Sequence, residues 1–268
     1  MTGLSLDQLT VCGVRPAELV EIAARAGYEA ISPFLNGNDL LPAVPLRAGD
    51  PDTVEMAQRM KDTGVFINNA DGFALVDDVS MEELRSGIAL MAEMQARAIV
   101  TLQFDSDASR GFDRFCQLRD WAADAGLLLL LEFTPLSQVA SLTDALEYRL
   151  RAGGTGIALL VDLFHLHQSG GTPVDLVGID PAIIAGAQLC DGPATMDAAK
   201  YYHRALFDRM IPGEGELPVR EFLAALPLAT MYGLEVPLPG HVARGIGHVE
   251  RAALLRDAAR RLEPEGRA

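Results

Sequence analysis

The feature that most constrains the fold of this chain is an apolar run that ends directly in a polar or charged side chain and recurs along the sequence. The clearest case is the five leucines of residues 127–131, which are followed at once by Glu132. The residues that follow or close these runs are Glu132, Asp162, Gln188 and Glu235. Such short continuous runs are typical of strands buried on both faces of a parallel sheet. Because charges are rarely buried unless paired or bound to a metal, the pattern predicts strand ends that share one divalent-cation site.

Eight strand-like runs alternate with helix-like segments from end to end of the chain. The predicted strands are residues 9–14, 28–34, 65–69, 98–104, 127–133, 157–163, 185–190 and 231–236. Segments with helical spacing lie between them, for example residues 17–26, 52–63, 81–95, 112–125 and 219–226. Eight units in 268 residues average about 33 residues each, the size of a βα repeat.

This pattern predicts an α/β fold, a single (β/α)₈ TIM barrel that occupies residues 1–268 as one domain. A doubly wound open sheet is the structural alternative. Against it, neither a G-x-G-x-x-G motif nor a P-loop follows the first predicted strand.

Bulk composition excludes several classes of function. The formal net charge of −15 argues against nucleic acid or an anionic membrane surface as a partner. We also find neither an apolar stretch of the roughly 20 residues that a membrane span needs nor the pattern of a signal peptide at the N-terminus. The three cysteines are scattered and form neither a disulfide framework nor a zinc motif. We therefore expect a cytoplasmic protein.

Two further observations narrow the chemistry. The two lysines, Lys61 and Lys200, do not lie at strand ends, which argues against a Schiff-base aldolase. The acidic turn 213–216 and the loop after the seventh predicted strand are poor phosphate cradles, so we expect a non-phosphorylated substrate.

In a TIM barrel the C-terminal strand ends carry the chemistry. The candidate metal ligands there, Glu132, Asp162, Gln188 and Glu235, form an all-oxygen set that favours Mg²⁺ or Mn²⁺, with Co²⁺ and Zn²⁺ as alternatives. Each carboxylate alone could instead cap a loop or pair with an arginine, and Gln188, inside its strand, could bridge backbone groups. Phe34, Asn69 and Gln103 also follow or end strands, and we predict that they contact substrate.

Two more candidates lie outside the strands. His165, three residues after Asp162, would project over the barrel mouth and bind a substrate oxygen or relay a proton, or it is an ordinary loop residue. Arg209 opens the loop 209–216 and could grip a substrate hydroxyl or carboxylate. Its alternative is a surface pair with Glu214 or Asp208.

The motifs that carry these residues resemble the xylose-isomerase-like TIM-barrel superfamily of sugar isomerases, epimerases, dehydratases and endonuclease IV. They are segments 131–133, 161–165, 187–193, 209–216 and 233–236. The resemblance implies that Glu132, Asp162 and Glu235 bind one metal ion with Gln188 as the fourth ligand, that His165 and Arg209 contact substrate, and that the protein forms a homo-oligomer. Gln188 departs from the histidine of many sugar epimerases but is similar to some dehydroshikimate dehydratases. The few histidines and the acidic charge do not fit endonuclease IV.

Three functions are compatible with these residues. The first is a metal-dependent isomerase or epimerase of a small sugar or keto-polyol, in which Glu132 and Glu235 move a proton on opposite faces of the carbon beside a carbonyl, through an enediolate. The second is a dehydratase (a lyase) of a cyclic keto-polyol or a 3-dehydroshikimate-like keto-acid, with Arg209 holding the carboxylate. The third is a barrel that binds a ligand without catalysis, against which the intact carboxylate set argues.

Overall fold

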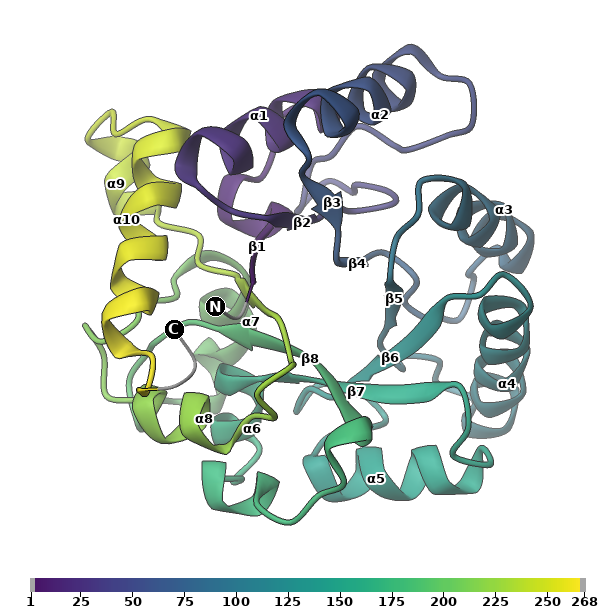
Figure 1. Cartoon of the computed structure of the whole chain (residues 1–268). Helices are drawn as coiled ribbons and strands as arrows, with labels where there is room; N and C mark the ends of the chain where they lie inside the picture. Colours follow the sequence, from purple (N-terminus) through teal and green to yellow (C-terminus); the bar gives the residue numbers. More distant parts are fainter. Residues whose placement is uncertain (1–2, 266–268) are drawn as a thin grey trace.

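The computed structural model describes residues 3–265, which form a ring of parallel strands surrounded by helices (Figure 1). The strands are β1 (Leu4–Asp7), β2 (Ala30–Ser32), β3 (Phe66–Ile67), β4 (Asn69–Ala70), β5 (Ala98–Thr101), β6 (Leu128–Glu132), β7 (Ile157–Asp162), β8 (Ile184–Leu189) and β9 (Tyr232–Leu234). The α-helices are α1 (Pro16–Ala26), α2 (Pro51–Thr63), α3 (Met81–Glu93), α4 (Ala108–Asp124), α5 (Leu142–Arg151), α6 (Leu163–Gln168), α7 (Tyr201–Phe207), α8 (Val219–Ala225), α9 (Pro239–Ala243) and α10 (His248–Leu262). Four short 3₁₀ helices are η1 (Gln8–Val11), η2 (Pro173–Leu176), η3 (Pro181–Ile183) and η4 (Ala198–Lys200).

The strands follow the order β3-β2-β1-β9-β8-β7-β6-β5-β4, and each neighbouring pair is parallel. Only Asn68 separates β3 from β4; β3 pairs with β2 and β4 pairs with β5. The nine pieces therefore occupy eight positions around a nearly closed ring, and the third strand is split in two. This confirms the predicted TIM barrel.

The position of the first strand was predicted wrongly. Residues 9–14 do not form a strand: η1 covers most of the apolar part, and β1 lies earlier, at Leu4–Asp7. There β1 pairs with β2 and β9. Thr10 explains why the apolar segment leaves the sheet, since its hydroxyl donates to the Leu234 carbonyl (2.6 Å) and accepts from the Val236 N–H (2.8 Å). These bonds fold η1 across the end of β9.

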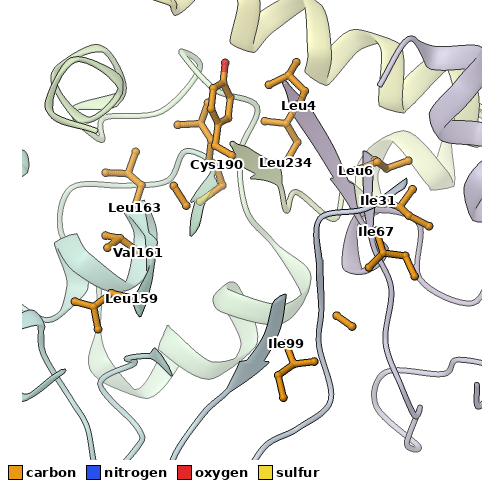
Figure 2. Close-up of a cluster of buried hydrophobic side chains, with 14 of the residues drawn as sticks. Leu4, Leu6, Ile31, Ile67, Ile99, Leu159, Val161, Leu163, Cys190 and Leu234 are labelled. Atoms are coloured by element: carbon orange, nitrogen blue, oxygen red, sulfur yellow. The ribbon is translucent and has the colours of Figure 1, made fainter. Parts of the chain in front are cut away.

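Side chains alternate between two layers along each strand. The outward ones form one large apolar layer with the helices, and Figure 2 shows part of it, with Leu6, Ile31 and Leu234 from three neighbouring strands. The inward ones at the N-terminal side form a small plug inside the ring. Its buried members are Ala98, Val100, Leu130, Ala158 and Leu160. The plug fills the floor of the barrel, so inward side chains one step further along each strand lie at the opposite, C-terminal mouth.

The helix ends follow the expected local chemistry. Helix α1 begins with Pro16 and ends at Gly27, whose φ of 80° is a left-handed conformation that glycine adopts without strain. The Ser80 hydroxyl accepts from the Glu83 N–H at the start of α3. Helix α4 begins four residues before its predicted start because the Asp107 carboxylate accepts from the N–H groups of Ser109 and Arg110. Within residues 3–265, no helix combines the length and apolar character needed to cross a membrane.

Candidate active site

Four adjacent strands bring the predicted ligand residues to one side of the C-terminal mouth. Glu132 and Asp162 end β6 and β7, Gln188 lies near the end of β8, and Glu235 directly follows β9. Asp162 is in register with Gln188 across the β7–β8 pair. All four side chains are buried. Residues far apart in the sequence are neighbours here because parallel strands end at the same rim.

The tightest cluster at this rim consists of Glu132, Asp162 and His165. One ligand atom from each lies within 4.8 Å of the other two, which is close enough to share one ion. The turn into α6 produces this arrangement, because Asp162 Oδ1 accepts from the N–H groups of Phe164 (2.6 Å) and His165 (3.1 Å). That cap folds His165 back over the mouth, where its Nε2 lies 3.5 Å from Glu132 Oε1. We predicted His165 as a substrate contact, and the geometry also allows it to be a metal ligand.

Arg209 links this cluster to Glu235. One guanidinium nitrogen is 2.5 Å from Asp162 Oδ2 and another is 2.8 Å from Glu235 Oε2. The third, Nε, donates to the Ala205 carbonyl at 2.7 Å. Arg209 is therefore buried and fully occupied, and the surface pair with Glu214 or Asp208 is not formed.

Asp191 anchors the loop that carries Arg209. Its Oδ1 accepts from the N–H groups of Gly192 and Leu217, and its Oδ2 accepts from Gly213 at 2.8 Å. Its backbone also exchanges two hydrogen bonds with Met210, the residue after Arg209. A Cβ atom on Gly215 would lie 2.2 Å from Asp191 Oδ1, so only glycine allows the loop to wrap around this carboxylate.

Asp7, at the end of β1, is a member of the site that the sequence analysis missed. Gln188 Nε2 donates to both Asp7 Oδ2 and Glu235 Oε1, each at 3.1 Å. The Asp7 carboxylate fills the space over Gly233, where a Cβ atom would lie 2.3 Å from both of its oxygens. The sequence did contain a signal, since the segment 4–7 alternates leucine with polar residues and ends in a carboxylate, like the longer runs.

Burial and mutual repulsion raise the pKa values of most carboxyl groups in the site. Burial raises the pKa of Glu235 to about 8, against the opposing effect of Arg209, and Asp7 adds to the rise. The pKa of Glu132 is also raised, by burial and then by the charges of Glu235 and Asp71. Burial is again the main cause for Asp7, whose pKa is about 6. These groups favour a proton or another positive charge nearby.

Asp162 and His165 shift the other way. Burial alone would raise the pKa of Asp162, but the Arg209 guanidinium and His165, with the hydrogen bonds that Asp162 accepts from them, together lower it. Burial lowers the pKa of His165 to about 4, so the imidazole is neutral near pH 7. Its Nδ1 lies 2.7 Å from the Tyr201 hydroxyl, which in turn lies 2.5 Å from Thr134 Oγ1. This chain of hydrogen bonds fixes the ring with Nε2 toward Glu132.

The predicted substrate contacts do not all reach this cluster. Asn69 begins β4, the second piece of the third strand, and its Oδ1 accepts from Ser32 and Asn68. Phe34 lies at the same rim, bridged to Asp71. Gln103 does not join them: its Nε2 donates to the Tyr148 hydroxyl of α5 at 2.7 Å, away from the mouth.

The chain matches the family model described as "Xylose isomerase-like TIM barrel" over residues 20–264. That match covers most of the chain. This chain belongs to the xylose isomerase-like TIM barrel family. A search of curated proteins returned no match.

Several solved structures superpose over nearly the whole chain. The IOLI protein, solved with a bound zinc atom, is 15% identical, with 97% of this chain and 98% of that chain covered and a TM-score of 0.76. The probable 3-DHS dehydratase AsbF from Bacillus anthracis is 15% identical over 99% and 100% of the chains, with a TM-score of 0.75. D-allulose 3-epimerase from Methylomonas sp., solved with D-allulose, is 14% identical over 97% and 96%, with a TM-score of 0.72. At these identities the likeness establishes the fold alone.

The residues of this xylose isomerase-like barrel suit a divalent cation in two respects. Glu132, Asp162 and His165 offer hard oxygen and imidazole donors at shared reach. Gln188 Nε2 donates to Asp7 and Glu235, which orients the amide. Its Oε1 is buried and has no hydrogen-bond partner among residues 3–265. An oxygen without a partner, next to several carboxylates, is the kind of group that a cation satisfies.

Proposed function

We propose that this chain is a divalent-metal-dependent isomerase or epimerase of a small, non-phosphorylated sugar or keto-polyol. One observation carries the proposal: two buried carboxylates, Glu132 and Glu235, flank the positions of Asp162 and Gln188 on four consecutive strands. A substrate seated over the middle two would have one carboxylate on either side.

Glu132, Asp162 and Gln188 would hold the ion, together with Glu235 or His165. When bound, it would polarise the substrate carbonyl and stabilise the negative charge of the enediolate. Mg²⁺ or Mn²⁺ suits the mainly oxygen donors best, and Co²⁺ or Zn²⁺ would be accepted with His165 as a ligand.

Glu132 and Glu235 would move the proton. One carboxylate removes it from the carbon beside the carbonyl, and the other returns a proton to the opposite face, which inverts that carbon. The neutral His165, held by Tyr201, would bind a substrate oxygen through Nε2 and pass a proton between oxygens when the carbonyl changes position.

The test is exchange of the substrate proton with solvent deuterium. The Mn²⁺- or Mg²⁺-loaded protein is incubated with a panel of ketoses in D₂O, and loss of the C–H signal is followed by NMR. We expect Glu132→Gln and Glu235→Gln to abolish exchange, whereas Glu147→Gln, on the exposed face of α5, leaves it unchanged. Exchange retained in both site variants would refute the roles assigned to these carboxylates.

A second function, dehydration of a cyclic keto-polyol or a 3-dehydroshikimate-like acid, is favoured by the His165–Tyr201 pair. It lies beside Glu132 and could protonate a departing hydroxyl after the same first step. Incubating the Mn²⁺-loaded protein with 3-dehydroshikimate and recording the ultraviolet absorbance of an aromatic product distinguishes this reaction. A protein that gains no thermal stability from metal would instead support a ligand-binding barrel without catalysis.

A further inference from the structure

Two buried polar atoms on the far side of the mouth from β7 have no hydrogen-bond partner among the described residues. They are Asn69 Nδ2 and Asp71 Oδ2. Their side chains are only 4% and 8% exposed. Buried polar groups are almost always hydrogen-bonded within a folded protein, so two such atoms two residues apart indicate a ligand contact.

Both side chains point into the barrel. Ala70, between them, packs in the outer apolar layer, and strand alternation turns Asn69 and Asp71 to the inner face. The electrostatics agree, because burial and then the charges of Asp7 and Glu235 raise the pKa of Asp71. Asp71 therefore faces the same space as the candidate metal ligands, from the opposite wall.

Within the protein, the side chains of Asn69 and Asp71, which line this wall of the barrel, use only part of their hydrogen-bonding capacity. Asn69 Oδ1 accepts from the Asn68 amide (3.0 Å) and the Ser32 hydroxyl (3.3 Å), which orients the amide and leaves its N–H₂ group free. The wall thus presents one donor, Asn69 Nδ2, beside one acceptor, Asp71 Oδ2. A hydroxyl group both donates and accepts, so vicinal hydroxyls of a ligand complement this pair.

The negative charge of the mouth also disfavours an anionic ligand. Five inward carboxylates surround it: Asp7, Asp71, Glu132, Asp162 and Glu235. The cationic side chain among them, Arg209, already pairs with Asp162 and Glu235. No ion pair links Asp71 to a cationic side chain among the described residues, and, after burial, the charges of Asp7 and Glu235 already raise its pKa, so a ligand carboxylate placed there would meet the same repulsion.

We propose that Asn69 and Asp71 form a hydroxyl-binding wall that selects an uncharged polyhydroxy ketone and discriminates against its carboxylate analogues. The inference rests on the proposed function in taking a keto-polyol as the ligand. It goes further by excluding the acidic substrate class and by naming the residues responsible.

The test compares matched neutral and anionic ligands on the Mg²⁺-loaded protein. The pairs are D-fructose with D-fructuronate and D-tagatose with D-tagaturonate, which differ by a carboxylate in place of the terminal CH₂OH. Dissociation constants are measured by NMR titration. We expect the neutral member to bind at least about tenfold more tightly. Asp71→Asn should reduce that ratio by about tenfold, while Asn69→Ala weakens both members of a pair. Asp78→Asn, which removes an exposed carboxylate from the following loop, is the matched control and should leave the ratio unchanged.

The outcomes separate this inference from the proposed function. Equal or tighter binding of the uronates by the unmodified protein, or no binding of any neutral ketose, overturns it, and neither result requires the variants to fold. An unchanged ratio in a folded Asp71→Asn variant overturns it as well. Deuterium exchange is measured on the same samples: exchange without discrimination leaves the proposed function standing, and discrimination without exchange upholds the wall and refutes the function.

Discussion

At the scale of single residues, the contact between Asp7 and Gly233 shows how tightly the mouth is packed. The carboxylate of one strand occupies the space where a side chain of the neighbouring strand would otherwise lie. Gly233 is therefore required for the hydrogen bond between Asp7 and Gln188, and through it for the orientation of the Gln188 amide.

We expect Gly233→Ala to destabilise the protein by about 1–3 kcal/mol, because the added methyl displaces a buried carboxylate. It should also weaken metal binding, since Gln188 loses the partner that orients it. Urea unfolding and a metal titration measure the two effects. Gly240→Ala, at a helical position with room for a methyl group, is the control. Equal stability of the two variants would contradict the packing described.

The raised pKa of Glu235 makes metal binding depend on pH. With a pKa of about 8, this carboxyl is mostly protonated at pH 7 in the metal-free protein, and an ion must displace the proton. We expect binding to tighten as the pH rises from about 6 to 8, with release of about one proton or more per ion at pH 7, because the pKa of Glu132 is raised as well. Calorimetry in two buffers of different ionisation enthalpy counts the protons. Glu235→Gln should release fewer, and an equal number from both proteins would refute this assignment.

The raised pKa of Glu235 also determines how the stability of the metal-free protein changes with pH. A carboxyl whose pKa is higher in the folded than in the unfolded chain stabilises the fold fully only below its unfolded pKa, about 4.3 for glutamate. For Glu235 this contribution is lost as the pH rises through about 8. The metal-free protein should therefore lose stability over this window, and bound metal should reduce the loss.

Individual site residues differed in how well the sequence predicted their positions. Glu132 and Asp162 could be predicted because each directly follows a long apolar run. Asp7 was missed because its strand has only two leucines. Gln103 was placed at the mouth, but strand alternation from the outward Ile99 turns it toward α5. Side chains alternate between the two faces of a strand, so the face of Gln103 cannot be assigned from the sequence unless the strand boundaries are known.

At the scale of elements, the loop after β8 determines where Arg209 lies. No pattern in the sequence links Arg209 to Asp162 or Glu235, which are 47 and 26 residues away. The link depends on Asp191, whose carboxylate gathers three backbone N–H groups of the loop and its start. The barrel and the starts of α1, α2, α3 and α8 could be predicted to within one residue, whereas this tertiary clamp could not.

We expect Asp191→Asn to destabilise the protein by about 1–3 kcal/mol, because an amide provides one acceptor oxygen in place of two and leaves a buried N–H unpaired. Arg209 should shift with the loop and lower kcat/KM by about tenfold or more. Asp208→Asn, on the exposed side of the same loop, removes only a surface pair with Arg204 and should change stability little. Unfolding in urea and steady-state kinetics distinguish the two variants, and matching behaviour would exclude the clamp.

At the scale of the whole molecule, the five carboxylates at one rim exceed the charge of the Arg209 guanidinium and oppose folding unless protons or a cation balance them. Mg²⁺ or Mn²⁺ at about 100 times its dissociation constant should add about 2.7 kcal/mol and raise the Tm by about 5–10 °C. Chelation should reverse the change, and Asp162→Asn should abolish it. A melting temperature that is insensitive to metal would argue against a cation at this rim.

The interrupted third strand position has a consequence for how the ring opens. β3 and β4 pair with their neighbours over two residues each, whereas β6 and β7 pair over four. Regions with few backbone pairings exchange amide hydrogens most readily, so deuterium uptake should be fastest at residues 66–71 among the strands. A bound polyol that contacts Asn69 would hold β4 in place beside this interruption. Binding of a polyol at the mouth should then slow deuterium uptake at residues 66–71, where the ring has the fewest strand pairings.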